Sequence, residues 1–274
     1  MEEAVNKKTI HLSEAEIRQR RIERVYMVLP IISISLLILL WISASKNSEF
    51  PSPRETLDRL ILLFEKPVKG MNIFGHVWHS LLRIFAALLF NWTFGIAFGI
   101  LIGWNKKAKA LFTPLFNAFR AIPPLAWIPL ITLWFGSGEI PKILIVIFGS
   151  IGSVVVNTQA GISNVDQLYK DVGTIFGANK KQMLFRIGIP SSLDAIFAGI
   201  RTSTSAAWMV VLAAEMLGAR SGVGFLITRG MDSIDMPLIL MSMIAIGIVG
   251  ALLAIFTQII EGLVCPWTKK REAF

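Results

Sequence analysis

A chain of 274 residues in which 54% are hydrophobic and only 16% are charged has too little polar surface to cover a soluble domain of this size. Its mean hydropathy of +0.64 and its short charge clusters between long uncharged runs predict an integral membrane protein. One cysteine and three histidines exclude a disulfide framework and a multi-cysteine metal site, and they disfavour an enzyme. The net charge of +9 lacks a basic stripe interleaved with aromatic residues, so we expect no nucleic-acid partner.

Uncharged stretches near the roughly 20 residues that a bilayer core requires predict five transmembrane helices, and a sixth contains charges. The predicted spans are residues 25–45, 84–105, 121–138, 143–165, 193–216 and 236–260. We therefore expect an all-α integral membrane protein with six transmembrane helices. Residues 1–24 are expected to form an N-terminal helix, 25–265 the transmembrane domain and 266–274 a tail.

The lysines and arginines predict the orientation of these spans. With the N-terminus inside, sixteen of the 27 basic residues lie on the cytoplasmic side, eight lie outside, and Arg83, Arg120 and Arg201 lie in or beside spans. Because cytoplasmic loops are enriched in Lys and Arg, both termini are expected in the cytoplasm of a multi-pass protein of the cell membrane. A cleaved signal peptide is the alternative for the first span, although its 21-residue apolar run is long for one.

Two regions before the fourth span have distinctive patterns. Residues 53–65 follow Ser52 as a cap and repeat apolar residues at helical spacing, which predicts an amphipathic helix on the outer surface. The third span contains consecutive prolines, Pro123 and Pro124, so a straight helix is not expected there. Broken helices within a membrane lie against protein or a water-filled cavity, which indicates a solute pathway. The alternative is a packing kink that faces a neighbouring helix.

The fifth span carries Arg201, Ser205, Trp208, Leu212 and Glu215 at spacings of four, three, four and three residues. This spacing places them on one helical face and predicts a polar stripe through the membrane. With Arg120, Arg201 would supply positive potential for an anion on the pathway. Trp127 or Trp208 would narrow the passage as a gate. The alternative for Arg201 is a structural role, in which it binds carbonyl groups freed by the prolines.

The loop of residues 166–190 is too regular for a simple connector. We expect a short helix up to Phe176, a break at Gly177, a second helix over residues 179–186 that carries Lys180 and Lys181, and a new start at Pro190. Such a protruding helix could dock into a groove of another protein.

This loop resembles the coupling motif of a known family, the permease subunits of binding-protein-dependent ATP-driven importers. The motif reads Glu-Ala-Ala, three residues, Gly, nine residues, Ile, one residue, Leu-Pro. The chain matches it at Gly177, Ile187 and Pro190, with Asp171, Val172, Gly173 and Ile189 as substitutions. The runs FRAIPPLAWIPL at residues 119–130, WFGSGE at 134–139 and SGVGFL at 221–226 resemble the branch that imports taurine, aliphatic sulfonates, nitrate, bicarbonate and thiamine precursors.

The resemblance, which covers roughly residues 77–265, implies a type I importer permease fold with a cytoplasmic coupling helix. It implies an importer of two such permeases, two cytoplasmic ATPase subunits and an extracytoplasmic solute-binding protein. Asp171, Gly177, Lys180, Lys181 and Pro190 would then contact the ATPase. The chain has no phosphate-binding loop of the G-x-x-x-x-G-K type, so ATP and magnesium would be bound by the partner and no cofactor or metal is expected here.

The wording of the motifs favours taurine or another sulfonate as the solute, with nitrate, bicarbonate or a thiamine precursor as alternatives. A secondary transporter is a further alternative, because broken helices and buried charges also occur in that class. A membrane-embedded enzyme is a third, in which His76 and His79 bind a metal with Glu65, although no further acidic cluster lies nearby.

Overall fold

The computed structural model describes residues 14–46 and 50–267, and this part of the chain is built from helices without a β-strand. The chain divides into two compact units, Met1–Glu55 and Thr56–Phe274. Residues 1–13 of the predicted N-terminal helix and 268–274 of the predicted tail lie outside the described residues.

The described part of the first unit contains one long helix, α1 (Glu14–Ser45), with Pro30 inside it. The boundary expected between residues 24 and 25 therefore falls within a continuous helix. Val28–Ser45 is apolar enough to cross a membrane. After the helix, the indole Nε1 of Trp41 donates to the carbonyl oxygen of Pro51 at 2.9 Å, which ties the following turn to α1.

The amphipathic helix expected over residues 53–65 is confirmed as α2 (Pro53–Glu65). Ser52 caps it, because its hydroxyl accepts from the backbone of Glu55 while the Glu55 carboxylate accepts from the backbone of Ser52 at 2.7 Å. Further along α2, Arg59 pairs with Asp235 at 2.6 Å, the residue that caps the last long helix of the chain.

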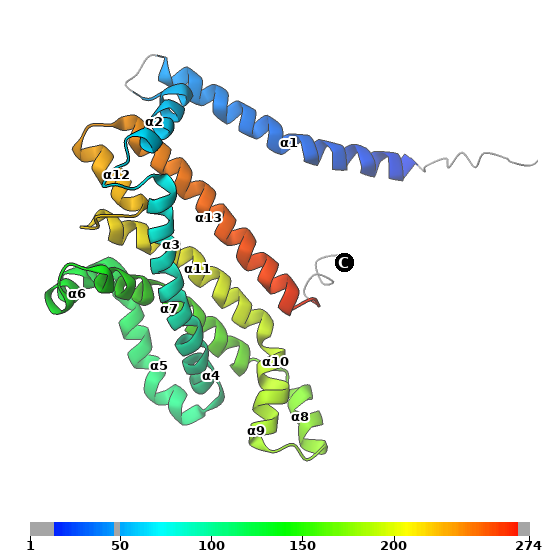
Figure 1. Ribbon diagram of the computed structural model, residues 1–274. Coiled ribbons are helices and arrows are strands. Elements are labelled where there is room, and N and C mark those ends of the chain that lie inside the picture. Colours follow the sequence, from blue (N-terminus) through cyan, green and yellow to red (C-terminus); the bar gives the residue numbers. More distant parts are fainter. Residues whose placement is uncertain (1–13, 47–49, 268–274) are drawn as a thin grey trace, which may run out of the picture. The chain divides into compact units, whose positions relative to one another are not determined.

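The second unit is organised around two long helices, α7 (Glu139–Ser163) and α11 (Leu193–Met216), which form its most extensive helix pair. Figure 1 shows that α3 (Ile73–Phe90) and α13 (Met236–Val264) flank this pair, and that α12 (Val223–Asp232) lies at one end. Close approach depends on small residues: a side chain at Gly199 would meet Asn157 of α7. Five helices of the described chain can cross a membrane, and the predicted count of six requires one bent pair to be counted as a span.

The second span starts earlier than predicted. The π-helical turn η1 (Asn91–Gly95) joins α3 to α4 (Ile96–Trp104), and together they run without interruption from Ile73 for 32 residues. At about 1.5 Å per residue this is roughly 48 Å, longer than a bilayer core of about 30 Å. The apolar run that begins at Ile84 marks the membrane part, so Arg83 lies at its boundary and the earlier turns extend beyond it.

The third span is the bent pair. α5 (Lys106–Ala121) is followed by the 3₁₀ turn η2 (Pro124–Trp127) and α6 (Ile128–Phe135), at an angle of 87°. The expectation that this span is not straight is confirmed, but the predicted range 121–138 is wrong as an element. Ile122, forced into an extended conformation by the proline after it, ends α5, and Asn105 caps its start just before a lysine cluster.

The loop after α7 forms α8 (Gln167–Ile175), a break at Gly177 with φ +71°, and then α9 (Lys180–Gln182), the π-helical turn η3 (Met183–Gly188) and α10 (Ile189–Ser191). Figure 1 shows α8 and α9 at the end of the second unit opposite α12. The predicted restart at Pro190 is wrong, since the helical path runs from Lys180 to Ser191. The wider helical turn of η3, just before Pro190, accommodates this residue, which lacks a backbone N–H.

Candidate functional site

A polar hollow lies where the broken third span meets the central helix pair. Its volume is about 400 Å³, and its walls come from α5, η2, α7 and α11. The wall on α7 is one helical face, because Gly149, Gly152, Ser153, Val156 and Asn157 are spaced at three and four residues. Arg120, Ile122, Pro124, Phe148 and Thr202 complete the lining.

The hollow forms at the proline break, where the chain turns by 87° and η2 crosses beside α7. Gly149 permits this crossing, since a side chain there would collide with Val210 of α11 and crowd Pro124. Three aromatic rings fix the bend: Trp127 lies 5.6 Å from Phe119 and 5.5 Å from Phe148, centroid to centroid. Trp127 is half-buried in this cluster, next to the hollow.

Among the described residues that line the hollow, Arg120 is the only one with a charged side chain. Its Nε donates to Oδ1 of Asn117 on the same helix at 3.0 Å, and the side chain is exposed. Within residues 14–46 and 50–267, no carboxylate pairs with it. The charge of Arg120 is thus held in the hollow without a counter-charge.

The residues of the predicted stripe on α11 do not form one polar surface, which corrects that expectation. Arg201 is half-exposed and pairs with Glu261 of α13 at 3.1 Å, and Ser205 is exposed. Trp208 is buried in the hydrophobic core, where its Nε1 donates to the carbonyl oxygen of Ile246 at 3.2 Å. Glu215 is completely buried at the far end of the helix. Residues at this spacing do not share one environment, because α3, α12 and α13 all pack against α11 and cover different parts of its surface.

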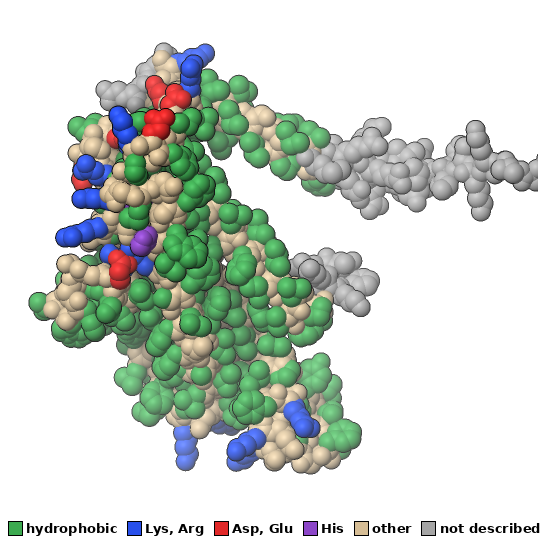
Figure 2. Space-filling model, viewed as in Figure 1, with side chains coloured by type: hydrophobic (Ala, Val, Ile, Leu, Met, Phe, Trp, Pro, Cys, Tyr) green, Lys and Arg blue, Asp and Glu red, His purple; other side chains and the backbone are tan. Residues whose placement is uncertain are grey.

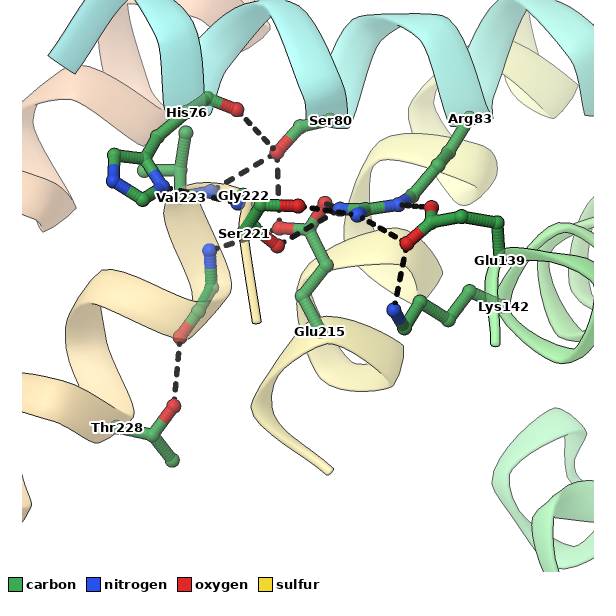
Figure 3. A network of polar contacts seen from close by, with 11 residues as sticks. His76, Ser80, Arg83, Glu139, Lys142, Glu215, Ser221, Gly222, Val223 and Thr228 are labelled. Atoms are coloured by element: carbon green, nitrogen blue, oxygen red, sulfur yellow. Dashed lines mark hydrogen bonds and ion pairs between the residues drawn. The ribbon is translucent and has the colours of Figure 1, made fainter. Parts of the chain in front are cut away.

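Glu215 belongs to a buried polar cluster that links four helices (Figure 3). Arg83 of α3 donates from its NH1 to Glu215 at 2.6 Å, and from Nε and NH2 to Glu139, the first residue of α7, at 2.5 and 3.0 Å. Arg83 is 2% exposed and Glu215 is 0% exposed, whereas the side chain of Glu139 is 56% exposed. Lys142 also pairs with Glu139 at 2.9 Å, so two positive and two negative charges balance.

The loop before α12 closes the cluster with backbone groups. The Ser80 hydroxyl donates to Glu215 at 2.9 Å and accepts from the backbone of Val223, and Gly224 donates its N–H to Glu215 at 3.0 Å. His76, predicted as an alternative metal ligand, accepts from the backbone of Gly222 at 3.2 Å. Within the described residues no group of His, Cys, Asp and Glu could hold a metal ion.

Sequence reasoning missed this cluster as a unit, although its parts were visible. The run WFGSGE, which ends in Glu139, and the run SGVGFL, which begins with Ser221, are separate marks of a family in the sequence, and Glu215 belongs there to the predicted stripe of the fifth span. Arg83 was assigned only to the edge of a span. The signal that could have joined them is charge balance: Glu139 and Glu215 are carboxylates at the ends of two apolar helices, where a cation is needed beside them, and Arg83 lies at the boundary of a third.

The residues predicted to dock a partner lie on the surface of α8, α9 and α10. Asp171, Gly177, Lys180, Lys181 and Pro190 are all exposed. Between the lysines and the body of the protein, Gly173 is buried against Ile187 and Met183, so α8 packs closely on η3. Ile175 and Phe176 at the end of α8 are 82% and 85% exposed. Figure 2 shows basic side chains gathered at this end of the second unit.

Comparison with known proteins adds a family match. Residues 95–270 match the family described as "Binding-protein-dependent transport system inner membrane component". The chain is 32% identical over 253 residues to the nitrate import permease protein NrtB of Synechocystis sp., covering 89% of this chain and 91% of the relative. It is 28% identical over 218 residues to the taurine transport system permease protein TauC of Escherichia coli, covering 79% of each.

Solved structures share the fold. A chain of the inward-facing MetNI methionine ABC transporter superposes with a TM-score of 0.62 at 17% identity, covering 69% of this chain and 94% of that one. A chain of a bacterial ABC transporter for the import of alginate superposes with a TM-score of 0.64 at 14% identity, covering 91% of this chain and all of that one.

Proposed function

The chain belongs to the family of binding-protein-dependent transport system inner membrane components, and we propose that it is the permease through which a small oxyanion, best a taurine-like sulfonate, enters the cytoplasm. The observation that carries this proposal is the polar hollow with the uncompensated charge of Arg120 inside a membrane-spanning helix bundle. A fixed positive charge in a low-dielectric wall attracts an anion more strongly than the same charge in water.

The names of the relatives support an anionic solute. Nitrate, taurine, aliphatic sulfonates and bicarbonate stand in the names of relatives that are 28 to 32% identical to this chain. All four solutes carry an oxyanion group. The motif wording at residues 119–139 favours the sulfonates, and the higher identity to NrtB makes nitrate the second candidate.

The energy for transport would come from partners. We place α8, α9 and both termini on the cytoplasmic side, because sixteen of the basic residues fall on that side. The exposed apolar end of α8, with Lys180 and Lys181 beside it, suits the groove of an ATPase subunit. A second copy of the chain would close the open side of the hollow, and an extracytoplasmic binding protein would deliver the solute at the α12 end. ATP and magnesium would be held by the ATPase.

Uptake into proteoliposomes tests the solute. The permease would be reconstituted with its partner ATPase and binding protein, and labelled taurine, ethanesulfonate, nitrate and bicarbonate would be compared at equal concentration. We expect ATP-dependent accumulation of taurine or ethanesulfonate. Accumulation of nitrate alone would replace the sulfonate assignment with the second candidate, and ATP-independent uptake would contradict the importer mechanism.

The coupling loop has a separate test. Gly177 adopts a left-handed conformation that proline cannot reach, and its N–H donates to the carbonyl oxygen of Thr174 at 3.0 Å. Gly177→Pro should abolish solute-stimulated ATP hydrolysis while the protein still inserts. Gly177→Asn, which tolerates this conformation, is the matched control and should retain most of the activity. Full stimulated hydrolysis with Gly177→Pro would exclude this loop as the coupling element.

A further inference from the structure

We propose that Arg120 binds the oxyanion group of the solute in the hollow, and that Arg201, at a similar depth, does not. This inference rests on the proposed import function and assigns the anion contact within it. Both arginines were predicted to supply positive potential on the pathway. In the structure the two arginines differ in whether a carboxylate pairs with them.

Pairing decides which arginine can attract an anion. Arg83, Arg59 and Arg201 each have a carboxylate partner, at 2.6, 2.6 and 3.1 Å, so their charges are already neutralised at short range. Arg120 has only the neutral amide of Asn117, which accepts from its Nε. Its two terminal nitrogens therefore retain the donors that suit an oxyanion such as a sulfonate or a nitrate.

The hollow lies at a depth where an uncompensated charge matters. Gly149 lies ten residues after the start of α7 and Asn157 six residues before its end, which is about 15 and 9 Å from the helix ends. A charged side chain that deep is costly in lipid unless it faces water or a ligand. The open, polar wall opposite Arg120 provides that environment.

The neutral groups of the wall complement the charge. Asn157 donates its amide N–H to the carbonyl oxygen of Ser153 at 2.8 Å, which orients its own carbonyl oxygen as an acceptor. Thr202 donates to the carbonyl oxygen of Ala198 at 2.9 Å, so its hydroxyl oxygen also accepts. Within the described part of the chain, no carboxylate lines the hollow. The wall can accept hydrogen bonds from the rest of a solute without repelling its anionic end.

Gly152 keeps room for the anion beside Arg120. A Cβ at this position would lie 3.9 Å from the Cβ of Arg120, and no other atom of the neighbouring helices lies as near. A Cβ could thus be added here without a collision in the helix packing, and a side chain at this position would take up part of the hollow beside Arg120.

The test measures uptake kinetics in reconstituted complexes, with whichever of the four labelled anions the wild-type complex accumulates. Arg120→Gln should raise the KM for that anion at least tenfold, Arg120→Lys should recover most of the loss, and Gly152→Val should raise the KM with the charge intact. Arg201→Gln is the matched control and should change the KM less than threefold.

The outcomes separate this inference from the proposed function. If the wild type takes up nitrate and no sulfonate, the sulfonate assignment fails, and a tenfold KM effect of Arg120→Gln on nitrate would still support the anion contact. If the wild type takes up taurine and Arg120→Gln leaves its KM unchanged, the import function stands and this inference is overturned. An equal or larger KM effect of Arg201→Gln would overturn it as well.

Discussion

Two arginines of this protein face opposite situations. Arg83 lies in a cluster in which every charge has a partner, with Glu215 fully buried beside it and Glu139 bound by two of its nitrogens. Arg120 lies in an open hollow without a carboxylate. The first region joins the ends of α7 and α11 to α3 and the loop before α12, whereas the second is bounded by a broken helix.

The difference shows how a membrane protein can separate structure from transport. A buried charge with a complete set of partners fixes helices and is strongly destabilising only when one partner is removed. A charge without a partner contributes little to the fold and is available to a solute. The two regions should therefore respond to mutation in opposite ways, one in stability and the other in kinetics.

The largest expected effect follows from removing the cation of the cluster. Arg83→Gln would leave Glu215 buried without its positive partner, which should cost about 3 to 5 kcal/mol of stability. Thermal melting of the detergent-solubilised protein, followed by size-exclusion fluorescence, would measure the loss. Arg120→Gln is the control and should melt within about 2 °C of wild type, as expected for a change of up to about 0.5 kcal/mol at an exposed site. Equal melting temperatures of Arg83→Gln and Arg120→Gln would contradict the assignment of Arg83 to the stability of the fold.

Two tryptophans should also differ in what their removal does. Trp208→Ala removes a core side chain and should destabilise the protein by about 3 to 5 kcal/mol without opening the hollow. Trp127→Ala loosens the aromatic cluster at the bend and should raise passive anion efflux from liposomes without ATP. Both were predicted as gates, and unchanged efflux in both variants, with normal coupled uptake, would exclude a gating role for either ring.

Glycines around Glu215 give an intermediate effect. A Cβ at Gly222 would collide with the carboxylate of Glu215, and its φ is +112°. Gly218 has a similar φ of +118° but open space around it. Both alanine variants should lose about 1 to 3 kcal/mol from backbone strain, and Gly222→Ala should lose more because Glu215 must move. Denaturation of the purified variants would measure both, and equal losses would mean that Glu215 moves without cost.

The smallest expected effect tests whether the pair with Glu261 neutralises Arg201. Glu261→Gln would leave the charge of Arg201 unpaired at a partly exposed position, where such a pair is worth at most about 1 kcal/mol. We expect a KM for the transported anion that falls by no more than about fivefold, because 1.4 kcal/mol corresponds to a factor of ten. A rise in KM would contradict the idea that pairing with Glu261 neutralises the charge of Arg201.

Much of the fold could be predicted from apolar length alone. The range 193–216 coincides with α11, 53–65 with α2, and the start at Met236 with α13, because each of these helices begins or ends at a clear cap or charge. The bend in the third span was also predictable, since two prolines remove consecutive donors. The start of α3 was not, because His76, Ser80 and Arg83 appear polar until their buried partners are known.

The candidate site was predictable only by residue type. Arg120, Trp127 and Arg201 were selected as charges and rings in unusual places, and the structure puts only Arg120 in the lining of the hollow. Ser153, Asn157 and Gly152 were missed because small and neutral residues on a helix are ordinary packing residues. Pairing of Arg201 with Glu261 could not be derived, because nothing in a sequence without an alignment relates positions sixty residues apart.

The Arg83 cluster also imposes an order on how the chain is made. Arg83 is separated by 56 residues from Glu139 and by 132 residues from Glu215. When α3 first enters the bilayer, neither carboxylate has yet been synthesised, so the arginine must remain at the water interface. Only when α7 and then α11 arrive can the guanidinium become buried. A chain that stops before α11 still has Glu139 but lacks Glu215, so the inner carboxylate partner of Arg83 is missing and the guanidinium cannot be buried with its full set of partners.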